Sequence, residues 1–235
     1  MDKKALVQKY AGAVKFLCGL YNLGSRLRIK GKGNGNRLVA PRALLKGVRI
    51  RFQGSGNTVR IGDYSQLKNV EVYIHGNNNV VEIGSWCHLL GTEFCEEEDH
   101  NRISIGSGTK ILGKTHFAAI ESTALTVGEN CLFSSDVHYR TGDSHAVLDM
   151  EGRRINPSRD ITLGDHVWVG TKTTILKGAQ VGRDSIVGAC AVVTGAHPET
   201  NCVLAGVPAK VVKRDVNWDV NRGIAAGVEM EESAT

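Results

Sequence analysis

The stretch Ile161-Thr-Leu-Gly-Asp-His-Val-Trp-Val-Gly170 opens a run, extending to Val193, in which an aliphatic residue returns at every sixth position. An α-helix needs a period near 3.6, whereas six residues suit a short strand followed by a turn. Three such units make a triangular coil of about 18 residues, and successive coils stack at the ~4.8 Å spacing of paired strands. The run therefore predicts a parallel β-helix whose axis is filled by Leu163, Val169, Ile175, Val181, Val187 and Val193.

The chain before this run repeats with a longer period of 22 residues. The repeated unit is a tetrapeptide of aliphatic, polar, aliphatic and glycine residues, which indicates a short strand with one buried face. It occurs at Val59-Arg-Ile-Gly62, Val81-Glu-Ile-Gly84, Ile103-Ser-Ile-Gly106 and Leu125-Thr-Val-Gly128. We interpret the longer period as an 18-residue coil with four extra residues at one corner, where Asn57, Asn79 and Asn101 adopt left-handed backbone. One all-β solenoid is thus expected over residues 53–213, and the usual crossover rule alone would make it right-handed.

The two ends of the chain follow other patterns. Residues 2–23 carry an apolar stripe typical of an amphipathic helix, formed by Leu6, Tyr10, Ala13, Leu17 and Leu20/Tyr21. Residues 1–51 hold 13 Lys and Arg residues and a single acid, although the whole chain has a net charge of only +5. We expect residues 1–52 to form a basic cap over one end of the solenoid. The alternatives are contact with an anionic polysaccharide or with an anionic membrane surface; nucleic acid is not expected. Residues 214–235 are expected to be a loosely ordered tail.

The cysteines and the hydrophobic segments restrict the setting of the protein. The six cysteines include no CxxC pair, so reduced, buried thiols are expected and no metal site is predicted. The chain contains no apolar run of about 20 residues, as a membrane span requires. Lysines interrupt the apolar residues at the N-terminus, which argues against a signal peptide. These features predict a cytoplasmic protein, with contact at the inner face of the membrane as a variant.

The regular repeat of aliphatic residues is interrupted around Thr141-Gly-Asp-Ser-His-Ala-Val147. Steps of six from Phe133 reach Tyr139, His145, Glu151 and Pro157, and none of these is an aliphatic residue. We therefore expect residues 138–160 to project from the solenoid as a loop. Long loops in compact folds are commonly functional, and histidine is the side chain best suited to take a proton near neutral pH.

Several motifs resemble those of a known family. The hexad series with Gly170, followed by Ala205-Gly-Val-Pro-Ala-Lys-Val-Val-Lys213, resembles the hexapeptide-repeat acyltransferases. The loop stretch 141–147, then Arg154-Ile-Asn-Pro157 and Gly164-Asp-His-Val-Trp-Val-Gly170, is similar to bacterial O-acetyltransferases of capsular and other surface polysaccharides. The resemblance implies a left-handed β-helix, a homotrimer with active sites between subunits, and acetyl-coenzyme A as the donor.

The resemblance also suggests roles for individual residues. It implies that His145 is the general base and that Trp168 belongs to the active site. A neighbouring carboxylate, Asp143, is a candidate to orient the imidazole, although a backbone carbonyl would serve equally. The indole of Trp168 is a candidate to donate to the oxyanion or to wall the acetyl pocket, and the amides of Gly170 and Thr171 are candidates to hold the thioester carbonyl of the donor. Further candidates are Gly188 and Ala189 beside the pantetheine arm, Lys210 and Lys213 at the donor phosphates, and His138 and Arg140 on the acceptor side.

Together these features predict an O-acetyltransferase that moves an acetyl group from acetyl-coenzyme A to a sugar hydroxyl. The acceptor expected is a capsular or other surface polysaccharide, or its precursor. An N-acetyltransferase acting on a nucleotide amino sugar or a small amine is the nearest alternative, because a deprotonated amine is already nucleophilic. A non-catalytic β-helix that serves as a scaffold is the alternative from a different class.

Overall fold

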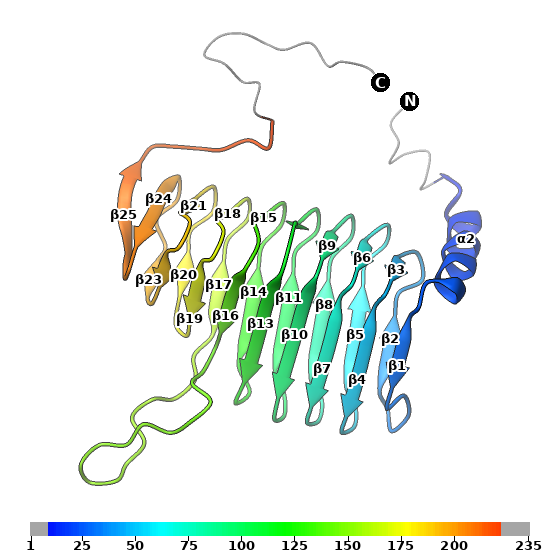
Figure 1. Cartoon of the computed structure of the whole chain (residues 1–235), viewed down its shortest axis with the longest axis horizontal. Helices are drawn as coiled ribbons and strands as arrows, with labels where there is room; N and C mark the ends of the chain where they lie inside the picture. Colours follow the sequence, from blue (N-terminus) through cyan, green and yellow to red (C-terminus); the bar gives the residue numbers. More distant parts are fainter. Residues whose placement is uncertain (1–8, 222–235) are drawn as a thin grey trace.

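The protein is a parallel β-helix with three sheets, described here from a computed structural model that covers residues 9–221 (Figure 1). Sheet 1 contains β1 (Arg28–Lys30), β4 (Arg49–Gln53), β7 (Glu71–His75), β10 (Thr92–Glu97), β13 (Thr115–Ile120), β16 (Val137–Arg140), β19 (Thr174–Leu176) and β22 (Val192–Val193). Sheet 2 contains β2 (Arg37–Val39), β5 (Thr58–Ile61), β8 (Val80–Ile83), β11 (Arg102–Ile105), β14 (Ala124–Val127), β17 (Ile161–Leu163), β20 (Gln180–Val181) and β23 (Ala196–His197).

Sheet 3 forms the remaining face and is closed at its C-terminal end by an antiparallel strand. It contains β3 (Leu44–Lys46), β6 (Gln66–Lys68), β9 (His88–Leu90), β12 (Lys110–Ile111), β15 (Leu132–Phe133), β18 (Trp168–Val169), β21 (Ile186–Val187), β24 (Cys202–Gly206) and the antiparallel β25 (Ala209–Arg214). The strands of each sheet are neighbours from successive coils, so a residue lies beside its equivalent in the next coil. This stacking confirms the solenoid predicted from the six-residue period.

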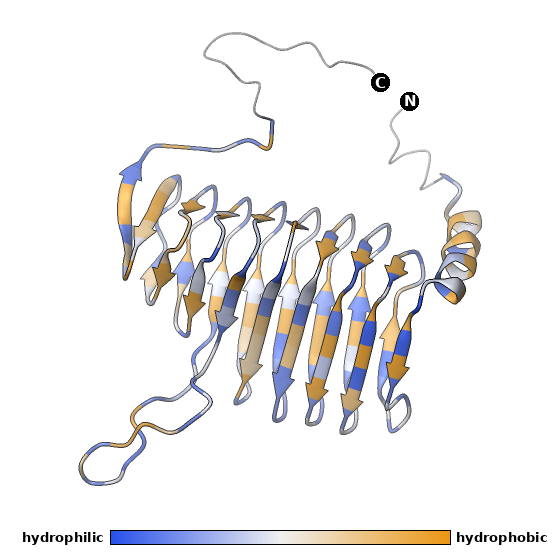
Figure 2. Cartoon of the chain, viewed as in Figure 1, coloured by the Kyte–Doolittle hydropathy of each residue, from blue (hydrophilic) through white to orange (hydrophobic). Residues whose placement is uncertain are grey.

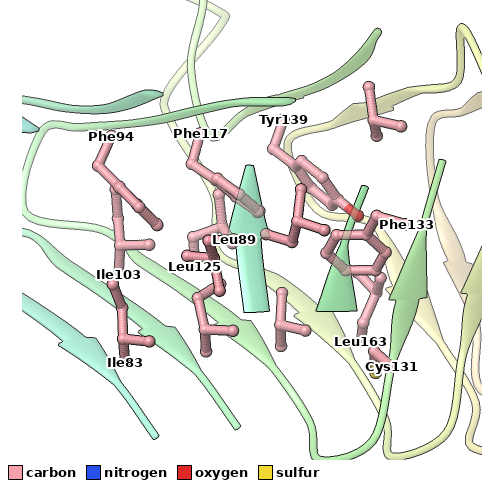
Figure 3. Close-up of a cluster of buried hydrophobic side chains, with 14 of the residues drawn as sticks. Ile83, Leu89, Phe94, Ile103, Phe117, Leu125, Cys131, Phe133, Tyr139 and Leu163 are labelled. Atoms are coloured by element: carbon pink, nitrogen blue, oxygen red, sulfur yellow. The ribbon is translucent and has the colours of Figure 1, made fainter. Parts of the chain in front are cut away.

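The core is a set of columns that run along the axis. Hydrophilic and hydrophobic positions alternate along the strands, as Figure 2 shows, so each strand directs one side inward. In sheet 1 the rings of Phe94, Phe117 and Tyr139 stack on one another, with centroid distances of 5.2 and 4.6 Å (Figure 3). Sheets 2 and 3 contribute mainly aliphatic columns, such as Ile83, Ile105 and Val127. The buried aromatic side chains lie mainly in sheet 1, and Phe133 of sheet 3 packs against Phe117 and Tyr139.

Tyr139 corrects the expected start of the projecting loop. Its side chain is fully buried and pairs in register with Phe117 on one side and Ile175 on the other. The six-residue pattern therefore continues through β16, because an aromatic ring fills the axial position where an aliphatic residue was expected. The segment that leaves the stack runs from Thr141 to Asp160, between β16 in sheet 1 and β17 in sheet 2 (Figure 1).

The asparagines at the corners stabilise the stack in a different way from the one expected. Asn57, Asn79 and Asn101 are buried, and none of the three has a positive φ. Instead, their side chains form a ladder: the Asn79 backbone N–H donates to Asn57 Oδ1 over 2.9 Å, and the Asn101 N–H donates to Asn79 Oδ1 over 2.7 Å. The ladder satisfies backbone groups that would otherwise be buried without partners. Left-handed backbone occurs beside it, at Asn78.

The same corner accounts for both the long period and the loop. The four extra residues of the 22-residue coils lie between sheets 1 and 2. They lengthen the sheet 1 strands of those coils, so β13 is longer than β19, which belongs to an 18-residue coil. The ladder continues from Asn101 to Thr123, whose hydroxyl donates to Thr141 Oγ1 over 2.6 Å. The loop begins directly after Thr141, so it is a larger insertion at a corner that already carried extra residues.

The N-terminal segment joins the stack earlier than the expected boundary at residue 53. Strands β1 to β4 are hydrogen-bonded members of the three sheets, so the coils begin at Arg28. Helix α2 (Ala11–Gly24) covers the first coil: Cys18 is buried, and Asn22 accepts from the Leu45 N–H over 2.8 Å and donates to the Ala43 carbonyl over 3.0 Å. Residues 2–8 of the expected helix lie outside the described part of the chain.

The apolar stripe of this helix faces solvent. Tyr10, Phe16, Leu17 and Leu20 are all more than half exposed, whereas the contact with the stack is made by the opposite side. None of the helices among residues 9–221 is long and apolar enough to cross a membrane. All six cysteines are free thiols; four are buried, while Cys95 is half-buried and Cys190 is exposed.

Candidate active site

The projecting loop is an ordered two-stranded excursion. Leu148 and Arg154 form an antiparallel bridge, and the Ile155 N–H donates to the Val147 carbonyl over 2.8 Å. Four apolar side chains are at least half exposed on it: Val147, Leu148, Met150 and Ile155. Exposed apolar side chains on a rigid protrusion are typical of a contact surface.

Asn156 fixes the part of the loop that carries His145. Its Nδ2 donates both to the Asp143 carboxylate and to the His145 carbonyl, each over 2.8 Å. Its Oδ1 accepts from the Val147 N–H over 2.7 Å. Lys177, which follows β19, reaches the same place and donates to Asp143 Oδ2 over 2.5 Å. One amide side chain thus ties the outgoing and returning halves of the loop together.

A second anchor holds the returning half of the loop to the preceding coil. Glu121, which follows β13, pairs with Arg154 at 2.5 Å and accepts from the Ser158 hydroxyl over 2.7 Å. The Arg154 hydrogen bond, followed by the Ser158 bond, lowers the pKa of Glu121 to about 2. The carboxylate is therefore ionised at every pH at which a histidine titrates.

His145 is exposed, and its imidazole has no hydrogen-bond partner among residues 9–221. Asp143 does not contact this imidazole, because its carboxylate is bound to Lys177 and Asn156. The Lys177 hydrogen bond, and then that of Asn156, lowers the pKa of Asp143. Asp143 is therefore bonded to Asn156, the residue that holds the backbone of His145. The expectation that the Asp143 carboxylate orients the imidazole directly differs from this arrangement.

His138 and Arg140 lie on the outer face of sheet 1. The rings of His138 and His116 are neighbours, with centroids 6.1 Å apart, and His116 Nδ1 lies 3.0 Å from Glu93 Oε2. A surface groove runs past these side chains and between β10, β13 and β16. Arg140 instead reaches the loop and donates to the Ser144 hydroxyl over 2.9 Å.

Trp168 lies on the outer face of sheet 3 and is 37% exposed, so its indole is accessible. Its neighbour is Trp218, with ring centroids 6.1 Å apart. Trp218 stacks on His166 at 4.2 Å, and its indole N–H donates to the His166 carbonyl over 2.8 Å. Trp218 was not predicted as a site residue, because the segment after Arg214 was expected to be a loosely ordered tail. A tryptophan in that segment was the available signal.

The residues expected to hold the donor lie beyond Trp168 in sheet 3. The Gly170 and Gly188 N–H groups donate to Val187 and Leu204 carbonyls within the stack, each over 2.8 Å. Neither of these two amides is therefore free to bind an oxyanion. A Cβ on Gly170 would lie 2.6 Å from the Ala189 nitrogen, so this glycine allows the coils to stack.

The other donor candidates remain accessible. Thr171 is half-buried, and its hydroxyl donates to the Ser135 carbonyl over 2.8 Å. Ala189, Lys210 and Lys213 are exposed; the two lysines lie on β25 at the C-terminal end of sheet 3.

One chain does not bring all of these groups together. The His145 loop leaves the corner between sheets 1 and 2, whereas Trp168 and the two lysines belong to sheet 3. Figure 1 shows the loop extending away from the edge at which β18 and β21 end. Within residues 9–221, no group of three or more His, Cys, Asp or Glu side chains is arranged to hold a metal ion.

Comparisons with known proteins identify the class of this fold and of these motifs. The model of the bacterial transferase hexapeptide family (six repeats) matches residues 160–195. The polysialic acid O-acetyltransferase of Escherichia coli O1:K1 / APEC is 34% identical over 90 residues, which are 38% of this chain and 29% of that protein. The chain thus matches well under half the length of this curated relative.

Solved structures extend the similarity over most of the chain. The crystal structure of the polySia-specific acetyltransferase NeuO superposes with a TM-score of 0.78 at 29% identity, covering 84% of this chain and 90% of that one. The polysialic acid O-acetyltransferase OatWY gives a TM-score of 0.76 at 27% identity, covering 88% and 94%. The fold is that of a hexapeptide-repeat, left-handed β-helix. The chain is thus similar to the hexapeptide-repeat transferases, in sequence over residues 160–195 and in fold over most of its length.

Proposed function

We propose that the protein transfers an acetyl group from acetyl-coenzyme A to a hydroxyl group of an acidic surface polysaccharide. The family and the names of the similar proteins support acetyl transfer to a polysaccharide, with two polysialic acid enzymes among the structures. The observation that carries the proposal is the loop itself. A rigid, doubly anchored loop presents an imidazole with no partner of its own, at a motif that resembles the family's catalytic histidine.

The proposed reaction begins with His145 as the general base. Its neutral imidazole takes the proton of the sugar hydroxyl as the oxygen attacks the thioester carbonyl carbon. The carbon–sulfur bond then breaks, and the imidazolium returns the proton to the sulfur of coenzyme A. The products are the acetyl ester and free coenzyme A, so atoms and charge balance without a metal or an oxidant. Trp168 walls the acetyl pocket or donates its indole N–H to the oxyanion.

The active site is proposed to form between subunits of a homotrimer. Its support is the placement of His145 and Trp168 on different sides of one prism, together with the exposed apolar side chains of the loop. Docking the loop beside sheet 3 of a neighbouring copy would bury these side chains and complete the site. A complementation experiment tests this arrangement: His145→Ala and Trp168→Ala chains, each inactive alone, regain activity when co-expressed. Failure of mixed oligomers to regain activity would contradict shared sites.

The acceptor is proposed to approach over sheet 1, beside His138 and Arg140. The groove there is lined by both histidines and Lys114, but also by the acids Glu71, Glu93 and Asp136. A neighbouring groove at β1 and β4 is basic through Arg28, Lys30, Arg49 and Arg51, which outnumber the two acids that line it. A polyanionic chain would be attracted to this second groove at low ionic strength. The direct test measures release of coenzyme A with native protein and a panel of acidic and neutral polysaccharides. Coenzyme A release is expected to increase when an acidic polysaccharide is added. A rate of acetyl-coenzyme A hydrolysis that does not change with any acceptor would contradict the proposal.

A place at the inner face of an anionic membrane is proposed for the N-terminal helix. Its support is the exposed apolar side of α2, with Phe16 and Leu20, flanked by Lys9, Lys15 and Arg26. Such a helix buries its apolar side at the acyl boundary while its cations meet lipid head groups. Native protein should sediment with vesicles containing anionic lipid, and the double variant Phe16→Ser, Leu20→Ser should remain in the supernatant. Equal sedimentation of both would contradict membrane contact.

A further inference from the structure

A pocket lies on the corner between sheets 2 and 3, apart from the groove beside His138. Its volume is about 420 Å³, which is within the range of small-molecule sites. Trp86 and Trp218 both line it, together with Lys110, Asp219, His166, Leu132, Gly108 and Asn130. Two indoles on one small pocket are notable in a chain with only three tryptophans, of which the third is Trp168.

The pocket lies where one coil has glycine at its corner. Equivalent corner residues in successive coils are Trp86, Gly108, Asn130 and His166, each linked to the previous coil by the same backbone hydrogen bond. Gly108 has a φ of 73°, and a Cβ there would lie 2.3 Å from Asn130 Oδ1. Glycine thus lets the Asn130 side chain approach this corner, and both residues line the pocket together with Trp86.

Both aromatic walls are fixed before any ligand arrives. Trp86 lies against Tyr64, with ring centroids 4.5 Å apart. Trp218 is stacked on His166 and hydrogen-bonded to its carbonyl. Preorganised walls of this kind lower the entropic cost of binding. A pyranose ring suits them, because its C–H face packs on an aromatic surface while its hydroxyls reach polar groups at the edge.

The register places this pocket in line with the acetyl-transfer site. Lys110 pairs with Leu132, and Leu132 pairs with Trp168, on the same outer column of sheet 3. Two coil spacings of ~4.8 Å put the backbone of Lys110 about 10 Å from that of Trp168. The donor candidates Lys210 and Lys213 lie on the opposite, C-terminal side of Trp168. The N-terminal side of Trp168 on sheet 3 is therefore free of donor candidates, so a long acceptor that reaches the acetyl-transfer site from sheet 1 could extend onto it.

We propose that this pocket is a secondary subsite that binds one sugar unit of the acceptor polysaccharide, about two coils from the unit that is acetylated. Trp86 and Trp218 hold the ring, and Lys110 meets the carboxylate of an acidic sugar. The inference rests on the proposed function, since it assigns the subsite to the same polymer. It predicts that acceptors long enough to reach both places bind more tightly than a single sugar.

Equilibrium binding without acetyl-coenzyme A tests the subsite separately from catalysis. The probes are a six-unit oligomer of sialic acid and the free sugar, each titrated calorimetrically into the full chain. Native protein is expected to bind the oligomer more tightly, and Trp86→Ala to weaken that binding about tenfold, as the loss of about 1.4 kcal/mol of ring stacking requires. Lys110→Gln should weaken it severalfold and reduce its salt dependence. Lys68→Gln, on the same sheet but outside the pocket, is the matched control and should match native protein.

The outcomes distinguish the two proposals. If native protein acetylates the oligomer but Trp86→Ala and Lys110→Gln bind it as native protein does, the subsite is refuted and the proposed function stands. Because Lys110 is a surface side chain, its variant remains informative even if Trp86→Ala proves unstable. If native protein neither binds nor acetylates any acidic oligosaccharide, the proposed function and the subsite are both refuted.

Discussion

The side-chain amide of Asn156 holds the backbone of His145, with its Nδ2 2.8 Å from the His145 carbonyl oxygen. The same nitrogen also donates to Asp143, and the amide oxygen accepts from the Val147 N–H. No other side chain in the described loop spans both of its halves in this way. The position of the imidazole thus depends on one residue that never needs to touch the substrate.

Replacing Asn156 with Ala is expected to lower kcat by about 100-fold, because a misplacement of about 1 Å costs that much in a positioned reaction. The KM for acetyl-coenzyme A should change little, since the donor candidates lie on sheet 3. Steady-state kinetics with both substrates varied measure this. Glu151→Gln, at the exposed tip of the same loop, is the control and should retain native kinetics; a native kcat in Asn156→Ala would contradict the positioning role.

Asp143 and Lys177 are expected to act as a pair. Asp143→Asn and Lys177→Met should lower kcat by similar factors, and the double variant should be no worse than either single one, because both break one interaction. Lys177 and Asn156 lower the pKa of Asp143, so its contribution is complete above the ordinary pKa of 3.8 and is lost only as pH falls through the lower folded value. The acid limb of the pH–rate profile should therefore be the same in Asp143→Asn as in native protein. A displaced acid limb in this variant would instead indicate direct contact with the imidazole.

Glu96 is expected to make folding stability fall as pH rises. It is fully buried in sheet 1, in register with Ile74 and Ala119, and no side chain of residues 9–221 donates a hydrogen bond to its carboxyl oxygens. Burial raises its pKa from 4.5 to about 8. Between those values the folded protein keeps a proton that the unfolded chain releases, so stability declines by up to about 1.4 kcal/mol per pH unit and levels off above pH 8.

Chemical denaturation of native protein and Glu96→Gln at pH 5 and pH 8 measures this decline. The variant should lose most of the pH dependence, because an amide does not titrate. Glu93→Gln, on the exposed side of the same strand, serves as the control. An unchanged slope in Glu96→Gln would show that other groups govern the pH dependence.

Tyr139→Phe is expected to leave the free energy of unfolding unchanged or to raise it by up to about 1 kcal/mol, because it removes a buried hydroxyl that has no partner. The ring stays between Phe117 and Phe133, so packing is retained. Thermal unfolding measures the difference, and Tyr139→Ala provides the contrast, with an expected loss of about 3–5 kcal/mol. A clear destabilisation by Tyr139→Phe would mean that the hydroxyl makes a bond in solution.

The periodic part of the fold was predictable because stacking repeats one physical requirement in every coil. Each axial position must be apolar, so the six-residue and 22-residue periods appear directly in the sequence. Tyr139 was not recognised as an axial residue because the axial position must be filled by a side chain of sufficient volume, which need not be aliphatic. The asparagine ladder was not predicted because its hydrogen bonds join residues 22 positions apart, and no rule for local backbone conformation describes such bonds.

The site was less accessible to sequence reasoning because its residues are placed by irregular contacts. The interruption of the six-residue pattern pointed to His145. Nothing in the neighbouring sequence indicated that the Asp143 carboxylate would accept a hydrogen bond from Lys177, 34 residues later. Gly170 and Gly188 were expected to face the donor, and the structure shows their amides bonded within the stack. Trp218 reaches His166 from 52 residues away, a contact that depends on how the chain turns back after β25.

The measurement that tests the central claim most directly is the rate of acetyl transfer, followed as the release of free coenzyme A from acetyl-coenzyme A. Native protein and His145→Ala are compared with the same acidic polysaccharide as the acceptor. A general base contributes about 100- to 10,000-fold, so the variant should lose at least about 100-fold in kcat while it retains native folding and donor binding. His138→Ala, whose imidazole lies on β16 rather than on the loop, should keep most of its kcat. Equal turnover by native protein and His145→Ala would contradict the account.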